Sequence, residues 1–387
     1  MASSVGMDGI GFGPLKGLAE LIDPHATLLV TDRRIDSLYG NMLPDCPRIL
    51  VPRGEAAKNL RSLEVLYGQF LESGLDRGGM VLAVGGGSVS DLAGFAAATW
   101  MRGVAFAVAP TTLLAMVDAS IGGKNGIDLR DRKNMVGTFL RPSFVHCDVS
   151  LTASLPREEF ASGMAEMIKH GGIEGGIGFE ALEAYAAHAA HASPAAHAAL
   201  ASLVAMSMRV KLSIVREDEH ERGKRRLLNL GHSIGHAIEA ATGLPHGHCV
   251  AAGLASACRL SVRMGQMKES TAERIFALLE AWDLPSSIAK AAALAKSHAA
   301  HHAASPARVN GADDADDVND ADAADGANGT ARIADAQSLR TAASDYLGDD
   351  KKRKGSDILF ALPLDLGRVE IRPIPLEELR RFVMEAP

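Results

Sequence analysis

The chain has 387 residues, of which 47% are hydrophobic and 22% charged, and its formal net charge is -7. This composition is typical of a globular protein with a large core, and the length allows two domains. The negative charge argues against a nucleic-acid-binding surface. The longest apolar stretch, residues 94–110, is interrupted by Arg102 and is too short to span a membrane.

The cysteines and the N-terminus both indicate a reducing compartment. Cys46, Cys147, Cys249 and Cys258 are scattered and form no CxxC pair. They therefore indicate neither a zinc ribbon nor a disulfide framework. Residues 1–17 lack the basic head and apolar run of a signal peptide, so we expect a cytoplasmic protein.

The N-terminal part alternates between two kinds of segment. Helical spacing is found at residues 56–74 and 91–101. Apolar runs predict buried strands at residues 26–32, 48–52, 80–87 and 104–110. This alternation predicts a Rossmann-like parallel sheet with helices on both faces, whose ligands lie at the carboxyl ends of the strands. No convincing strand precedes residue 26.

The pattern becomes mainly helical from about Leu151, and strand signals return only at residues 357–363 and 368–374. We therefore predict an α/β fold with two domains. Residues 1–150 would form the nucleotide-binding α/β domain, and residues 151–387 a mostly α-helical domain. Within the second domain, residues 297–338 are rich in alanine and aspartate and carry few large apolar side chains. We expect a disordered acidic insertion there, because the segment cannot bury enough surface to offset its ordering entropy.

Two glycine-rich stretches of the first domain have compositions suited to anions. In "MVLAVGGGSVSDLAGF", a buried strand runs into three glycines, and a helix is expected to begin near Ser90 or Asp91. Glycines let the backbone approach a phosphate closely, and a helix N-terminus offers free N–H groups. The irregular run at residues 110–139 holds Lys124, Lys133 and Asn134, which suit an anionic substrate.

The second domain contains a run of histidines. His232 and His236 are four residues apart, so they share one face if the segment is helical, and His246 and His248 follow. The sequence HSIGH lacks the glutamate of the HExxH protease motif. One histidine alone is more often structural, but four in so short a run favour a metal or anion site.

Taken together, these stretches resemble the 3-dehydroquinate synthases of the sugar phosphate cyclase family. The resemblance runs from about Gly54 to the C-terminus, apart from the acidic insertion. It rests on "GGGSVSDLAGFAAATWMRG", "PTTLLAMVDASIGGKNGID", "RKNMVG", "LPREEFASGMAEMIKHG", "LLNLGHSIGHAIE" and "DDKKRKG", in this order.

The resemblance implies NAD and one divalent metal, usually zinc or else cobalt, as cofactors. The metal ligands would be Glu166, His232 and His246. The positions that match NAD contacts are Glu55, Lys58, Gly86, Gly87, Ser88, Asp91, Thr111, Thr112, Lys133 and Ser154. Those that match the substrate pocket are Arg102, Asp118, Lys124, Asn134, Lys169, Lys211, Arg225, Asn229, His236 and Lys351, with Lys352 as an alternative to the last.

The implied reaction converts 3-deoxy-arabino-heptulosonate 7-phosphate to 3-dehydroquinate and phosphate. Its steps are transient oxidation by NAD, phosphate elimination, reduction and an intramolecular aldol closure. Arg102 matches an arginine that reaches the neighbouring subunit's site, so the resemblance also implies a homodimer. Neither a nucleic acid nor a membrane is an expected partner.

One departure from the family pattern keeps alternatives open. This chain has "HGHCV" where the family usually has "HGEAV", so His248 replaces a glutamate. The substitution could retune the metal, or it could mark another sugar phosphate cyclase, an amino-dehydroquinate or valiolone-type synthase. Arg225 argues against the valiolone type, whose substrate lacks a carboxylate. A non-catalytic paralogue and a metal-dependent alcohol dehydrogenase are the remaining alternatives.

Overall fold

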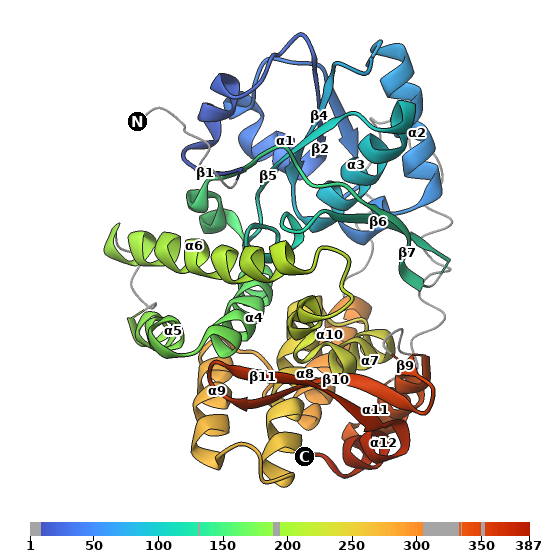
Figure 1. Ribbon diagram of the computed structural model, residues 1–387. Helices are drawn as coiled ribbons and strands as arrows, with labels where there is room; N and C mark the ends of the chain where they lie inside the picture. Colours follow the sequence, from blue (N-terminus) through green and yellow to red (C-terminus); the bar gives the residue numbers. More distant parts are fainter. Residues whose placement is uncertain (1–8, 131, 189–193, 305–332, 334, 350–352) are drawn as a thin grey trace. The chain divides into compact units, whose positions relative to one another are not determined.

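The computed structural model describes residues 9–130, 132–188, 194–304, 333, 335–349 and 353–387. The chain divides into two compact units (Figure 1). Unit 1 comprises Met1–Gly163 and His191–Glu219, and unit 2 comprises Met164–Ala190 and His220–Pro387. The α/β fold predicted from the sequence is confirmed.

Unit 1 is built on a six-stranded parallel sheet in the order β1-β8-β5-β4-β2-β3. The strands are β1 (Ile10–Phe12), β2 (Thr27–Asp32), β3 (Arg48–Val51), β4 (Met80–Gly85), β5 (Ala105–Pro110) and β8 (Val145–Cys147). The central strands are apolar throughout, because helices cover both faces of such a sheet. β1 was not predicted, because it has only three residues and only the middle one is buried, which gives no recognisable apolar run.

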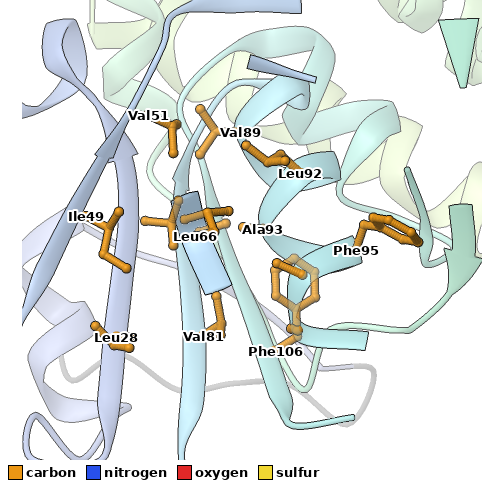
Figure 2. Packing of buried hydrophobic residues seen from close by; sticks show 14 of the residues in the cluster. Leu28, Ile49, Val51, Leu66, Val81, Val89, Leu92, Ala93, Phe95 and Phe106 are labelled. Atoms are coloured by element: carbon orange, nitrogen blue, oxygen red, sulfur yellow. The ribbon is translucent and has the colours of Figure 1, made fainter. Parts of the chain in front are cut away.

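Helices α2 (Leu60–Glu72) and α3 (Gly87–Thr99) pack against the sheet; α1 (Arg33–Tyr39) follows β2. Figure 2 shows Leu66 of α2 and Leu92 of α3 among the side chains of β2, β3, β4 and β5. Both leucines are fully buried. This core fixes the carboxyl edge of the sheet, from which the loops of unit 1 extend.

Two expectations for unit 1 were wrong in detail. Helix α3 begins at Gly87, three residues before Ser90, since glycine tolerates the close turn after β4. The run expected to be irregular contains an antiparallel hairpin, β6 (Lys124–Leu129) and β7 (Arg132–Phe139). Its glycines hide the strand pattern: a Cβ at Gly126 would lie 2.7 Å from the carbonyl oxygen of Val136.

Helix α6 (Pro194–Glu217) belongs to unit 1, although the sequence analysis placed it in the second domain. It packs on the short helices η5 (Ala115–Ala119) and η6 (Val149–Ser154). Among the described residues, only Ala195–Glu217 is long and apolar enough to cross a membrane, and 56% of its apolar window is buried. That burial is expected of a core helix.

Unit 2 is mostly helical. Its long helices are the C-terminal part of α4 (Arg157–Glu174), α5 (Gly176–His188), α7 (His232–Thr242), α8 (His246–Arg263), α9 (Glu269–Ala281), α10 (Ile288–Ala304), α11 (Ala336–Tyr346) and α12 (Leu376–Glu385). A small antiparallel sheet joins β9 (Arg353–Lys354), β10 (Asp357–Asp365) and β11 (Arg368–Pro375). The two predicted strands near the C-terminus are therefore confirmed.

The expected acidic insertion is helical at both ends. Residues 297–304 complete α10, and Asp335 caps α11 by accepting a hydrogen bond from Ser338 N–H. Alanine is the strongest helix former, which explains why these ends differ from the prediction. Residues 305–332 and 334, and with them most of the predicted insertion, lie outside the described part of the chain.

Candidate functional site

Glycines bring α7 and α8 into close contact in unit 2. A Cβ at Gly253 would lie 2.0 Å from the carbonyl oxygen of Gly231, and one at Gly235 would lie 2.9 Å from that of Cys249. Because these positions have no side chain, the first turn of each helix meets the other. His232 and His246, the first residues of α7 and α8, consequently have ring centroids 5.3 Å apart.

Glu166 of α4 completes a three-residue cluster with these histidines. Its Oε1 lies 3.6 Å from His232 Nε2 and 3.7 Å from His246 Nε2. These separations are long for hydrogen bonds, but two ligands of one tetrahedral zinc ion lie about 3.4 Å apart when each bond is about 2.1 Å. The Glu166 side chain is fully buried, and neither oxygen accepts a hydrogen bond of normal geometry from the described residues. The donor set therefore fits a divalent metal.

Both histidines direct the same ring nitrogen toward Glu166. His232 Nδ1 lies 3.2 Å from the Leu230 carbonyl, and His246 Nδ1 lies 2.9 Å from Glu239 Oε2. An N–H at each Nδ1 donates to these acceptors, so Nε2 is the nitrogen at which a cation would bind, in place of any proton there. A ring held in this way is typical of metal-binding histidines.

The charges around Glu166 favour its ionised form. Burial raises the pKa of the carboxyl, but the ion pair with the buried Lys169, together with His246 and His232, holds it well below its usual range. Burial and Lys169 lower the pKa of His232 well below its ordinary value. Burial also lowers the pKa of His246, but Glu239 and Glu166 outweigh it and raise the value to about 10.

His236 is the exposed member of the histidine group. His236 lies one turn along α7 from His232. The centroid of its ring is 5.2 Å from that of His232 and 5.8 Å from that of His246. Ring nitrogens of the three histidines lie within 4.8 Å of one another. His236 is therefore adjacent to the buried donors and open to solvent, as a substrate contact would be.

The remaining predicted residues of unit 2 lie just before α7. Arg225 and Asn229 belong to the 3-10 helix η7 (Lys224–Asn229), and the guanidinium-bearing side chain of Arg225 is buried. Asn229 Nδ2 donates to Glu221 Oε1. Lys351 and Lys352 lie outside the described residues.

In unit 1, the N-terminus of α3 lies beside the glycines that follow β4. Gly86 is the N-cap and supplies no side chain to the first N–H groups of the helix. A Cβ at Gly86 would lie 3.3 Å from Thr112 Cγ2, and one at Gly87 would lie 3.2 Å from Ala119 Cβ. The hydroxyl of Thr111 is buried without a hydrogen-bond partner among the described residues. Free helical N–H groups over bare glycines fit the pyrophosphate of a dinucleotide.

A buried lysine connects several predicted residues of unit 1. Lys58 Nζ donates to Asp91 Oδ2 at 2.8 Å and to Asn134 Oδ1 at 2.6 Å, and lies 3.5 Å from Glu55 Oε2. Glu55 in turn accepts from Ser88 Oγ and lies 3.8 Å from Lys133 Nζ. Burial raises the pKa of Asp91 to about 6, against the opposing effect of Lys58. Asn134, expected in the substrate pocket, is thus bonded to a residue expected to bind NAD.

Lys211 of α6 forms a second ion pair in unit 1, between its buried ammonium group and the partly exposed carboxylate of Asp118. Its Nζ donates to Asp118 Oδ1 at 2.6 Å and to the Asp118 carbonyl at 2.7 Å. Both residues were expected in the substrate pocket, and the structure brings them into direct contact.

Ser154, Lys124 and Arg102 are the other predicted residues of unit 1. Ser154 Oγ accepts from Tyr39 and donates to the Leu151 carbonyl, which gives it a structural role in this conformation. Lys124 is exposed on β6. Arg102 is exposed next to Met101, and both residues have a left-handed φ.

Two carboxylates that hold predicted residues in place were not predicted from the sequence. Glu239 accepts from His246, and Asp128 Oδ1 accepts from Asn134 N–H at 2.7 Å. Glu239 is seven residues after His232, on the same helical face, so helical spacing was a usable signal. Asp128 gave no such signal, because its contact depends on the unpredicted hairpin and on the left-handed φ of Asn134.

The structure resembles 2-epi-5-epi-valiolone synthase from Streptomyces hygroscopicus subsp. jinggangensis 5008, solved with NAD+ and Zn2+ bound, with a TM-score of 0.73 at 22% identity over 97% of this chain and 95% of that one. It also resembles 2-deoxy-scyllo-inosose synthase complexed with carbaglucose-6-phosphate, NAD+ and Co2+, with a TM-score of 0.71 at 21% identity over 98% and 96% of the two chains. The chain therefore shares its fold with these two synthases.

Sequence similarity identifies the family of the chain. Residues 48–162 match the model of the 3-dehydroquinate synthase N-terminal domain, and residues 163–303 match that of its C-terminal domain. The 3-dehydroquinate synthase of Symbiobacterium thermophilum is 42% identical over 295 residues, covering 72% of this chain and 82% of its own length. That of Halorhodospira halophila is 42% identical over 275 residues, covering 69% and 77%. The chain belongs to the 3-dehydroquinate synthase family.

Proposed function

We propose that this protein converts 3-deoxy-arabino-heptulosonate 7-phosphate to 3-dehydroquinate and phosphate. The observation that carries the proposal is the cluster of Glu166, His232 and His246, whose separations suit one metal ion, in a chain of this family. A substrate with a carboxylate and a phosphate needs cationic partners. The buried Arg225 suits the carboxylate, because a planar guanidinium binds it in two-point fashion.

We infer that the protein uses NAD and a divalent metal, with Glu166, His232 and His246 as ligands. NAD when bound supplies a hydride acceptor, and the metal lowers the cost of deprotonating a substrate hydroxyl. The α3 N-terminus and Gly86 would hold the pyrophosphate.

The other residues position and balance charge. Lys58 holds Asp91 and Asn134 in place, and Lys169 partly neutralises Glu166. The ion pair with Asp118 holds the ammonium group of Lys211 in one position in unit 1. A positive charge fixed in this way needs no rearrangement before it binds an anionic substrate group. His236, exposed next to the metal ligands, would contact the substrate.

The test is to incubate zinc-loaded protein with NAD and the proposed substrate, and to follow phosphate, dehydroquinate and NADH. We expect equal amounts of phosphate and dehydroquinate and no net NADH, and we expect Glu166→Gln to abolish turnover. Net accumulation of NADH would instead indicate an alcohol dehydrogenase. Without turnover, the amino analogue and sedoheptulose 7-phosphate are tested next, with His248→Glu alongside the wild type.

We further propose that the protein acts as a homodimer in which Arg102 completes the site of the second copy. The support is the exposure of Arg102 on a turn where Met101, Arg102 and Gly103 all have positive φ, since such strain is retained where a conformation serves function. Arg102→Ala and Glu166→Gln should each be inactive, and mixing them under conditions of subunit exchange should restore activity. A monomer by sedimentation, or no recovery on mixing, would contradict this arrangement.

A further inference from the structure

Glu239 contacts His246, one of the three proposed metal ligands. Its carboxylate lies next to Nδ1, the ring nitrogen of His246 that faces away from Glu166. Its side chain is 10% exposed, and its Oε2 lies 2.9 Å from His246 Nδ1. The corresponding nitrogen of His232 is held by a neutral backbone carbonyl at 3.2 Å. The two histidines are therefore supported by groups of different charge.

The backbone around Glu239 also sets the position of His246. The Glu239 carbonyl accepts from Gly243 N–H at 2.8 Å, which ends α7, and Gly243 adopts a left-handed φ. Two residues separate this glycine from His246 at the start of α8. Glu239 thus contacts both the turn that leads to the ligand and the ligand itself.

From these contacts we propose that Glu239 is a positioning residue for the metal, acting through His246. The inference rests on the proposed metal site. By accepting from Nδ1–H, Glu239 fixes the tautomer and the ring orientation that direct Nε2 toward Glu166 Oε1. It also adds a negative charge to a buried cluster that holds Lys169 and would hold a dication. Without Glu239, the only negative charge of the cluster would come from Glu166. The cluster would then have a larger net positive charge than it has with Glu239, and such a charge is costly to bury.

The test measures zinc affinity by competition with a chromogenic chelator. We expect Glu239→Ala to weaken zinc binding by about 10- to 100-fold, the usual effect of removing such a partner. Glu239→Gln keeps an acceptor oxygen but loses the charge, so its affinity should fall between those of the wild type and Glu239→Ala. Glu183→Gln, which removes an exposed carboxylate paired with Arg274 in the same unit, is the matched control and should bind zinc as the wild type does.

A second readout separates positioning from a loss of folding. Glu239→Gln loaded with Co2+ should retain cooperative unfolding but show a shifted visible absorption band, because the ligand field from His246 changes. Equal zinc affinity of Glu239→Ala and the wild type would overturn the proposal, as would wild-type affinity no higher than that of Glu166→Gln. If the wild type binds zinc tightly but does not turn over the sugar acid phosphate, the proposed function fails and the role of Glu239 is still decided by the affinity ratio.

Discussion

Lys169 is a fully buried cation whose partner is Glu166, itself fully buried. Removing one member of such a pair leaves an uncompensated charge. We expect Lys169→Met to destabilise the metal-free protein by about 3–5 kcal/mol. A bound dication would replace the lost ammonium charge, so zinc should raise the Tm of the variant by more than it raises that of the wild type.

Lys290→Met is the matched control for Lys169→Met, because Lys290 pairs with Glu280 at the surface, with about half of each side chain exposed. It should change stability by less than about 1 kcal/mol. Calorimetry with and without zinc measures both variants. An equal zinc-induced rise in Tm for Lys169→Met and the wild type would be inconsistent with charge compensation at Glu166.

The cysteines should differ in reactivity by position. Burial raises the pKa of the Cys147 and Cys258 thiols to about 12, and Cys249 has no exposed surface. Cys46 is half-buried, and burial raises its thiol pKa against the lowering effect of Arg48. The thiolate is the reactive form, and a raised pKa reduces the thiolate fraction at neutral pH.

We therefore expect a chromogenic disulfide reagent to label one thiol in the native protein, and four after denaturation. The rate at Cys46 should increase about tenfold per pH unit between pH 7 and 8.5, because the thiolate fraction does so below the pKa. A native labelling rate independent of pH, or a second fast thiol, would contradict this assignment.

At the scale of elements, the contact between α7 and α8 determines where the histidines lie. A Cβ at Gly253 would approach the Gly231 carbonyl oxygen to 2.0 Å, and this atom belongs to the backbone. Gly253→Ala must therefore separate the helices. We expect it to destabilise the protein by several kcal/mol, as overpacking does, and to weaken zinc binding more than tenfold.

Gly68→Ala provides the contrast, because Gly68 lies inside α2 with nothing within 4 Å of the added Cβ. Alanine is the better helix former there, so this variant should gain about 1 kcal/mol. Chemical unfolding of the two variants gives both free energies. A neutral effect of Gly253→Ala on zinc affinity would show that the helix contact does not place the ligands.

The same elements show how far a sequence determines a site. Apolar runs predicted β2, β4 and β5, whereas the ligand set of Glu166, His232 and His246 came from the resemblance to the family and not from spacing alone. The hairpin β6–β7 was missed because glycines at a close strand contact remove the alternating pattern. Glu239 could have been predicted from its spacing on the face of α7 that carries His232, but Asp128 could not, because its contact with Asn134 depends on the hairpin.

At the scale of the whole molecule, neither unit is one continuous segment. Unit 1 requires α6, whose Val204 and Met208 are buried and whose Lys211 pairs with Asp118. We expect a fragment of residues 1–163 to lack cooperative unfolding and to bind a hydrophobic dye, since the surfaces of η5 and η6 lose their cover. Addition of a peptide of residues 191–219 should reduce the dye fluorescence. Cooperative unfolding of the fragment alone would contradict the assignment of α6 to this unit.

The alternation of the chain between the units also has a consequence for its synthesis. The chain leaves unit 1 after Gly163, returns at His191 and leaves again after Glu219. Because the chain is synthesised from the N-terminus, unit 1 cannot complete its folding until α6 has left the ribosome. By then Glu166 has long been exposed, while His232 and His246 are still to come. The nascent chain therefore carries Glu166 without its two histidine partners until His246 has been synthesised, and the complete ligand set can capture a metal only after that point.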